Sequence, residues 1–234
     1  MKPLQTMLFF AFFLCVNMTI TAQKLLEYIS KDAAIVAGIN PSALKEKANF
    51  EAIRKMEFYQ AILDQIPKGK DSETGKIFSD IFKTPEKYGM DFYSPSYFFV
   101  EKGKDGFFIN YIFKLSDANT FNAFFQEQIA KDGKSEIQNL AHYQLINNNG
   151  VAFAWNEKIV LISAGENKSK FQGADISTFK TDVNEVLKSL VERAMKLDKQ
   201  HSILQNPQFL KAQAMPNDAF IWMDYGYMIE IGKM

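Results

Sequence analysis

Apolar residues in the middle of the chain follow the two-residue period of β-strands. Between residues 107 and 115 every second residue is apolar, while Asn110 and Lys114 fall on the opposite face. A turn at 102–106, which contains two glycines, joins this segment to an apolar run at 96–101. The pattern predicts an antiparallel hairpin with one solvated face.

Further strands are expected on both sides of this hairpin. A short apolar run at 33–39 is typical of a buried strand. Segments 141–147 and 151–155 are joined through Asn-Asn-Asn-Gly, which is a strong hairpin signal. Strands at 158–163 and 219–224 complete the set.

Helices are predicted where apolar residues recur every three or four positions. The most regular helix covers 182–198, where Asp182 and Glu185 have the spacing of a capping box. The stretch 43–66 predicts one broken helix or two helices, with Ser42 as the N-cap. A polar loop at 68–76 follows.

Two more helix starts are indicated by capping residues. Ser116 or Asp117 precedes a helix that ends at Gly133, and Asn206 stands before a shorter helix that begins with Pro207. Together the elements predict an α+β fold, an antiparallel sheet with helices packed on one face.

One short sequence similarity links the two ends of the chain. Residues 31–36 (KDAAIV) resemble residues 217–222 (NDAFIW), and Asn40 and Asp224 follow the two strands. The similarity predicts either a last strand that completes the first sheet or a second repeat that begins near residue 216. We therefore divide the chain into 1–22, an α+β domain at 23–214, and a last strand at 215–234 that is also the candidate start of a truncated second repeat.

The first 22 residues have the three parts of a cleavable secretory signal peptide. Lys2 supplies the positive n-region, residues 7–16 form an unbroken apolar run, and a more polar stretch ends at Ala22. The apolar run is too short to cross a bilayer, which takes roughly 20 residues. We therefore expect export to the periplasm or the outer membrane, with no transmembrane segment after cleavage.

The only cysteine, Cys15, lies inside that apolar run and would be removed with it. The mature chain would then form no disulfide and be stabilised by its core alone. A lipid anchor at Cys15 is disfavoured, because lipoprotein processing expects a small residue just before the cysteine and Leu14 stands there.

Charge and motif content exclude several classes of function. Lys plus Arg and Asp plus Glu both number 27, so nucleic acid and anionic membranes are poor candidates for partners. The chain lacks a phosphate-binding loop, a serine-hydrolase elbow and a zinc-protease helix. Only two histidines occur and the mature chain has no thiol, which excludes a histidine-rich or thiolate metal site. No catalytic, cofactor-binding or metal-ligating residue is nominated, and no cofactor is expected.

Histidines and aromatic residues each have a functional and a structural interpretation. His142 stands at a strand start and is interpreted as an ordinary surface or core-edge residue, whereas His201 follows the long helix, where a cation interacts favourably with the helix dipole. The aromatic residues of the hairpin would form a platform for a sugar or peptide if their face were exposed, but a place in the core is preferred. They are Phe98, Phe99, Phe107, Phe108, Tyr111 and Phe113. Trp222 is also expected to be buried.

Several segments resemble a family of uncharacterised exported bacterial proteins that contain a domain of unknown function. Residues 26–33 (LEYISKDA), the strand that closes on Asn40 and the following helix with Lys45 and Lys47 are similar to the start of that family. Residues 202–204, Phe209 and 218–222 are similar to its mid-chain segment. The resemblance implies an envelope protein of Gram-negative bacteria, often a lipoprotein of about twice this length, of which this chain matches the N-terminal half. It implies no activity and no catalytic residues.

Three hypotheses for function remain at this point. The first is a non-enzymatic envelope module that binds or scaffolds an envelope protein or a glycan. The second is a hydrolase of envelope or extracellular polymers that uses unidentified carboxylates. The third is a truncated, non-functional fragment of a longer protein. An enzyme is expected to contain a cleft with convergent polar groups and a perturbed carboxylate, whereas a binding module is expected to expose a flatter aromatic or apolar patch.

Overall fold

The computed structural model describes residues 24–47, 80–81, 84–102, 106–132, 136–148, 150–167, 183–215 and 217–226. The predicted signal peptide at 1–22, the predicted loop at 68–76 and most of the predicted helical stretch at 43–66 lie outside these residues. Gly133 and Asp182 also lie outside them.

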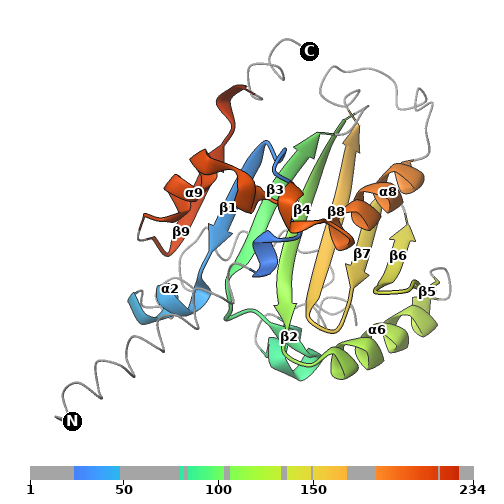
Figure 1. Cartoon of the computed structure of the whole chain (residues 1–234). Helices are drawn as coiled ribbons and strands as arrows, with labels where there is room; N and C mark the ends of the chain where they lie inside the picture. Colours follow the sequence, from blue (N-terminus) through green and yellow to red (C-terminus); the bar gives the residue numbers. More distant parts are fainter. Residues whose placement is uncertain are drawn as a thin grey trace, which may run out of the picture.

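Nine strands in the described part of the chain form one antiparallel sheet, and helices pack on it (Figure 1). The strands are β1 (Ile35–Ile39), β2 (Met90–Asp91), β3 (Ser96–Lys102), β4 (Gly106–Leu115), β5 (Gln138–Asn139), β6 (Gln144–Asn148), β7 (Val151–Trp155), β8 (Ile159–Asn167) and β9 (Ala219–Met223). The helices are α2 (Pro41–Lys47), α6 (Ala118–Asp132), α8 (Val183–Met195) and α9 (Pro207–Gln213), with 3-10 turns η1 (Pro85–Tyr88), η3 (Lys199–His201) and η4 (Ile203–Gln205). The sheet order is β5-β6-β7-β8-β4-β3-β1-β9, and β2 pairs with β4. The predicted α+β fold with an antiparallel sheet is confirmed.

Most strands lie where the two-residue period predicted them. The β3–β4 hairpin pairs Tyr97 with Ile112, and β7 covers the predicted residues 151–155. The strand predicted at 158–163 extends to Asn167, because β8 pairs along β4 as far as Gly106. Sequence periodicity missed the two-residue strands β2 and β5, which are too short to show a period.

The first face of the sheet, which carries Phe99, Ile112 and Leu161, is covered by α8, α9 and the N-terminal segment. Leu187 and Val191 of α8 are fully buried against it, and so is Leu26. Figure 1 shows α8 and α9 lying in front of the strands. The long, regular helix predicted at 182–198 therefore supplies the main cover of this face.

The second face is covered by α6 at the end of the sheet formed by β6, β7 and β8. Phe121 and Phe125 of α6 pack around Trp155, with ring centroids 5.8 and 5.3 Å from it. Helices therefore lie on both faces rather than one, because the inner strands carry apolar residues on both faces. Val160 and Leu161 are adjacent in β8, face opposite sides, and are both buried.

The expectation that the Asn110 side of the hairpin faces water is wrong. Phe108, Asn110 and Ile112 lie on the side of β4 that was expected to face water, and each is at most 6% exposed. They are covered because α8 crosses this part of the sheet, whereas the opposite side of β4 is partly open, with Ile109 47% exposed. A single polar residue in the strand, Asn110, gave the misleading signal of solvation.

Helix starts agree with the capping predictions at two of three positions. Asp117 Oδ1 accepts hydrogen bonds from the first amides of α6, and Asn206 Oδ1 does the same for α9. Ser42 is not the N-cap of α2. Asn40 Oδ1 lies 3.4 Å from the amide nitrogen of Ala43, and Ser42 Oγ instead donates to the carbonyl of Tyr93 at 2.6 Å.

The last strand, β9, belongs to the same sheet as the first. It pairs antiparallel with β1, and the residues aligned by the sequence similarity, Val36 and Trp222, are directly opposite each other. The two strands are therefore related by a local two-fold axis through this pair. Each strand also leads into helical residues, at Pro41 and at Tyr225.

None of the helices in the residues listed above has both the length and the apolar character that a bilayer span requires.

Gly89 ends η1, contacts the start of α6 and supplies the first test of the fold. Its φ is +73°, and a Cβ there would stand 2.1 Å from the carbonyl oxygen of Asp117. Replacing Gly89 with Ala is expected to cost about 2 to 5 kcal/mol, since left-handed strain and overpacking add. Equilibrium denaturation measures this cost.

The matched control is Gly150→Ala. Gly150 has a similar φ of +76°, but a Cβ there would meet only Val183 at 3.4 Å. This variant is expected to lose only the conformational part, about 1 to 2 kcal/mol. Equal losses at the two positions would contradict the predicted clash.

Candidate functional site

A cleft of about 580 Å³ opens at the end of the sheet, beside the turn between β7 and β8. Segments that are far apart in the sequence line it: the N-terminal turn, the start of α6, the loop before β6 and the residues after Trp155. The lining consists mainly of amide and aromatic side chains. Its residues are Tyr28, Ala118, Asn119, Asn122, Asn139, Leu140, Ala141, His142, Tyr143, Gln144, Trp155, Asn156, Glu157 and Lys158.

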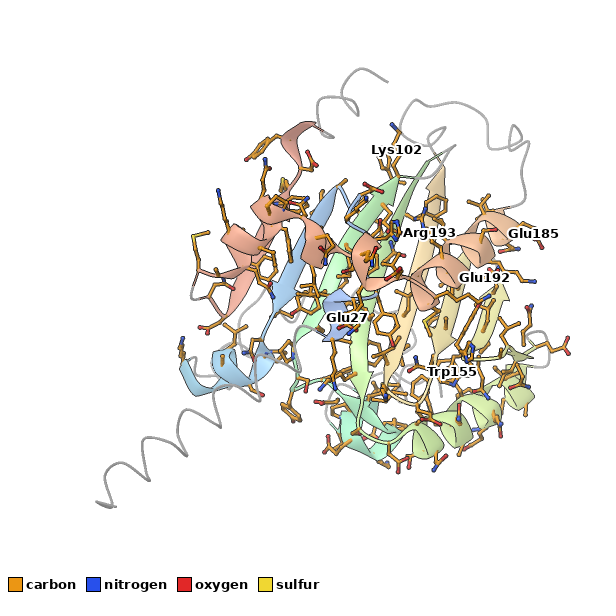
Figure 2. The ribbon with its side chains drawn as sticks, in the orientation of Figure 1. Glu27, Lys102, Trp155, Glu185, Glu192 and Arg193 are labelled. Atoms are coloured by element: carbon orange, nitrogen blue, oxygen red, sulfur yellow. The ribbon has the colours of Figure 1, made fainter. Side chains whose placement is uncertain are left out.

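The amides of the cleft are held by hydrogen bonds to its walls. Trp155 lies between β7 and α6 (Figure 2), and its indole Nε1 donates to Asn122 Oδ1 at 2.5 Å. Asn156 Oδ1 accepts from the amides of residues 158 and 159, which fixes the turn. Asn156 Nδ2 also lies 3.4 Å from the Tyr28 hydroxyl, so the N-terminal segment is joined to this turn.

One hydrogen-bond acceptor in the cleft wall has no donor within the described ranges. Gln144 Nε2 donates to Asn139 Oδ1 at 2.9 Å, whereas Gln144 Oε1 is buried and has no partner among the residues the structure describes. Burying a polar atom without a partner costs free energy, and this oxygen is enclosed in the wall rather than presented to the cleft. Amide groups that offer both donors and acceptors suit a neutral ligand with several hydroxyl or amide groups.

A second groove, of about 590 Å³, lies on the surface between α8 and the loop before η3. Its lining is strongly charged and includes Asp32, Glu192, Arg193, Lys196 and His201. Glu192 and Lys196 form an ion pair at 2.6 Å, which lowers the pKa of Glu192 and raises that of Lys196. The charged side chains that line this groove are therefore largely paired with one another along α8.

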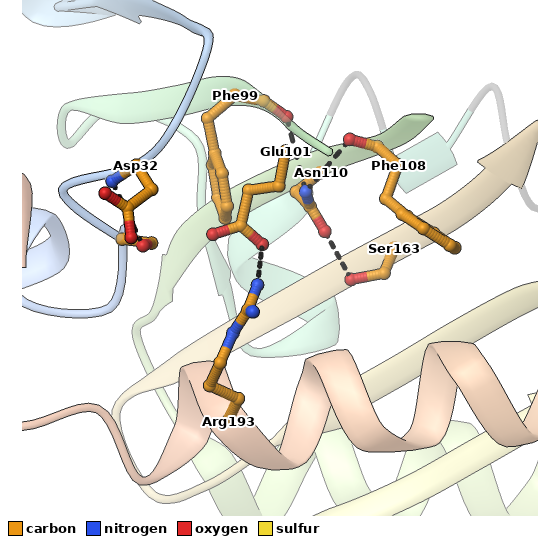
Figure 3. Close-up of polar contacts among 8 residues, drawn as sticks. Asp32, Phe99, Glu101, Phe108, Asn110, Ser163 and Arg193 are labelled. Carbon is orange, nitrogen blue, oxygen red and sulfur yellow. Dashed lines mark hydrogen bonds and ion pairs between the residues drawn. The ribbon is translucent and has the colours of Figure 1, made fainter. Parts of the chain in front are cut away.

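Beneath this groove lies a buried carboxylate that sequence reasoning did not identify. Glu101 of β3 is 5% exposed, and its Oε2 accepts from Arg193 Nη2 at 3.2 Å (Figure 3). Burial raises the pKa of Glu101, and the nearby Arg193 guanidinium only partly opposes this effect. The carboxylate does not line the groove, so its place indicates that it anchors α8 to β3.

Asn110 and Ser163 form a second buried polar pair beside Glu101 (Figure 3). Ser163 Oγ donates to Asn110 Oδ1 at 2.7 Å, and Asn110 Nδ2 lies 3.4 and 3.2 Å from the carbonyl oxygens of Phe99 and Phe108. All the hydrogen-bonding atoms of the Asn110 amide thus face partners inside the sheet. This pair crosses β3, β4 and β8 and is structural.

The two histidines lie in different places. His142 is exposed, in agreement with the surface interpretation, and lines the amide-rich cleft. His201 lies in η3, beyond the end of α8 at Met195, so the basic residue in the last turn of that helix is Arg193 instead. In the described ranges, no three His, Cys, Asp or Glu residues come together in a way that could hold a metal ion.

Three of the six hairpin aromatic residues are in the core, as preferred, whereas Phe107 and Tyr111 are half-buried. Phe99, Phe108 and Phe113 are at most 6% exposed, and Trp222 is 7% exposed. Phe98 is the exception, because it is 51% exposed and stacks on Tyr111 with ring centroids 4.2 Å apart. The hairpin therefore presents one exposed aromatic side chain rather than a platform.

The chain belongs to the DUF4836 family, a domain of unknown function, whose model matches residues 27–229. No curated protein and no solved structure matches the chain. The family match covers every strand of the sheet and nearly all residues that line the cleft and the groove.

The role assigned to Glu101 predicts an unusual pH dependence of stability. Because its pKa is raised on folding, the folded state binds the proton more tightly than the unfolded chain. Its contribution to stability therefore declines as pH rises from about 4 through the raised pKa. Replacing Glu101 with Gln removes this decline and leaves the protein within about 1 kcal/mol of wild type at pH 7. Denaturation followed from pH 4 to 8 measures both effects.

Glu136→Gln is the control, since Glu136 is an exposed carboxylate. It is expected to leave the pH profile of the wild type unchanged. If Glu101→Gln lost about 3 kcal/mol or more at pH 7, the ion pair with Arg193 would outweigh the cost of burying the charge.

Proposed function

We propose that the protein is an exported, non-enzymatic binding module of the bacterial cell envelope, and that its amide-rich cleft binds a neutral glycan. The single observation that carries the choice of ligand is the lining of the cleft, where amide and aromatic side chains predominate. Sites for small ligands combine apolar or aromatic walls with a few fixed polar groups. The walls here are richer in polar groups than that pattern, because amide side chains make up the largest share of the lining, which suits a ligand with many hydroxyl groups.

Aromatic and amide groups in the cleft recognise different parts of a sugar. The rings of Tyr28 and His142 supply flat surfaces, and the amides of Asn119 and Asn139 supply donors and acceptors for hydroxyl groups. Asn119 and Asn139 are exposed, so their side chains are accessible to a ligand. A neutral ligand also fits the even charge balance of the chain.

A hydrolase is less well supported by the same cleft. Most glycoside hydrolases use two carboxylates on either side of the scissile bond. Among the lining residues that the structure describes, Glu157 alone is a carboxylate. Glu101 has a raised pKa, but it is sealed beneath Arg193 and belongs to neither lining.

The place of action, the envelope, is proposed from the N-terminal sequence. Residues 1–22 have the charge, the apolar run and the small terminal residue of a cleavable signal peptide. The domain that follows contains no cysteine and gains its stability from two apolar clusters, so it needs no particular redox compartment.

Glycan binding is tested by the fluorescence of Trp155, whose indole bonds to Asn122 in the cleft wall. Trp222→Phe leaves Trp155 as the only tryptophan of the chain. Titration with chitotetraose, a neutral N-acetylglucosamine oligomer, is expected to shift its emission. Asn119→Ala combined with Asn139→Ala is expected to weaken binding at least about tenfold, because each amide removed costs about 1 kcal/mol.

The matched control is Gln208→Ala, which removes an exposed amide on α9 outside the cleft. It is expected to bind as the parent does. Emission that stays constant in titrations with chitotetraose and with peptidoglycan fragments would contradict the proposed ligand class, whatever the outcome for export.

Export is tested separately by intact-mass measurement of the protein from the envelope fraction of expressing bacteria. The expected mass is that of the chain without residues 1–22, because cleavage is expected after Ala22. A cytoplasmic variant in which Leu14 is replaced by Arg serves as the control, since a charge interrupts the apolar run. A wild-type species that keeps residues 1–22 would contradict the proposed export.

A further inference from the structure

The two edges of the sheet differ in how they are protected. β5 forms one edge with two exposed polar residues, Gln138 and Asn139. β9 forms the other edge with five apolar residues, AFIWM, and contains no charge and no proline. Natural edge strands are usually short, charged, interrupted by proline or covered, because an open apolar edge pairs with other chains. Within its five residues β9 carries none of these charges or prolines, and its only flanking charges are Asp218 and Asp224.

One side of the β9 backbone is hydrogen-bonded to β1, and the other side is open. Asp224 donates its amide to the carbonyl of Ala34, and Asn40 donates to that of Asp218, at 2.9 and 2.7 Å. In an antiparallel ladder, alternate residues face the same partner, so Phe220 and Trp222 also direct their backbone groups to β1. The backbone groups of Ala219, Ile221 and Met223 then point away from β1, where no described strand pairs with them.

The side chains on the second face of β9 are exposed as well. Ile221 is 68% exposed and Met223 is 39% exposed, and the neighbouring Ile39 and Phe98 are 37% and 51% exposed. On the first face, Phe220 and Trp222 are packed against Phe209 of α9. The strand is therefore held rigidly on one face while its second face and its outer backbone are open.

We propose that β9 pairs antiparallel with β9 of a second copy of this chain, so that two sheets join across a two-fold axis near Ile221. The strand is self-complementary in this arrangement, because Ile221 meets its own copy and the small Ala219 lies opposite the large Met223. The strand itself carries no charge, and the flanking Asp218 would lie opposite Asp224 of the second copy, where the ion pair of Asp218 with Lys47 at 2.8 Å offsets the like charges.

The protein already contains this kind of contact. β1 and β9 share a sequence pattern and pair about a local two-fold axis through Val36 and Trp222. In that internal pair, Ile35 lies opposite Met223 and Ala37 lies opposite Ile221. The dimer repeats on the outer side of β9 the same pairing of apolar strands, and isologous two-fold contacts are the commonest in homo-oligomers.

Sedimentation velocity of the mature chain, from about 1 to 100 µM, tests the proposal. A concentration-dependent dimer is expected. Ile221→Pro removes the outward amide while the amides that face β1 remain, and proline is tolerated on the solvent side of an edge strand. Association is expected to weaken at least about tenfold, because each dimer loses a main-chain hydrogen bond on both sides of the axis.

Ile221→Lys and Met215→Lys form a matched pair for the same measurement. Both place a lysine at an exposed apolar position, but Met215, 61% exposed, lies outside β9. Only Ile221→Lys is expected to give monomers, and unchanged circular dichroism shows that each variant is folded.

Hydrogen exchange of the wild type gives a readout that needs no variant. The amide of Trp222 is expected to be protected at every concentration, because it faces β1. The amide of Ile221 is expected to gain protection only as the dimer forms. A chain that is monomeric at 100 µM, or a dimer that both Ile221 variants leave intact, overturns the proposal.

Discussion

The pairing of β4 with β8 is the interaction on which the rest of the structure depends. These two strands form the longest ladder in the sheet, from Gly106 opposite Asn167 to Lys114 opposite Ile159. Both carry apolar residues at consecutive positions, so both faces of the sheet centre must be removed from water. That requirement explains why α8 and α6 lie on opposite faces. Apolar surface stays open on the second face away from α6, where Phe98, Ile109 and Ile221 are exposed.

Covering both faces of the sheet also buries polar side chains, which costs free energy unless they form hydrogen bonds. At the centre of the sheet the buried polar side chains form such bonds. Asn110 is enclosed by the Ser163 hydroxyl and two main-chain carbonyls, and Glu101 is matched by Arg193. These contacts join β3, β4, β8 and α8. They fix the position of α8 on the sheet more closely than apolar contacts alone would. Glu101, whose pKa is raised by burial, thus belongs to the architecture of the sheet, whereas Asn119 and Asn139 of the cleft are exposed.

The sequence predicted the elements well where a local signal was strong. The period of β4, the Asn-Gly turn before Val151 and the caps Asp117 and Asn206 all depend on neighbours in the chain. The covered side of Asn110 could not be predicted in this way, because α8 is contributed by residues more than seventy positions away. The cleft was missed for the same reason. Its walls come from Tyr28, the start of α6, the loop before β6 and the turn after Trp155, and no one segment carries a motif.

The similarity between the two ends of the chain illustrates how a weak sequence signal gains meaning from a structure. Residues 31–36 and 217–222 resemble each other because β1 and β9 occupy equivalent environments about one axis: each buries one face under the first-face cluster and leads into helical residues. The two strands differ in what lies on their outer sides. The outer side of β1 is taken by β3, whereas that of β9 faces no described strand. The axis that relates the strands therefore also identifies the position beside β9 that a further strand would occupy.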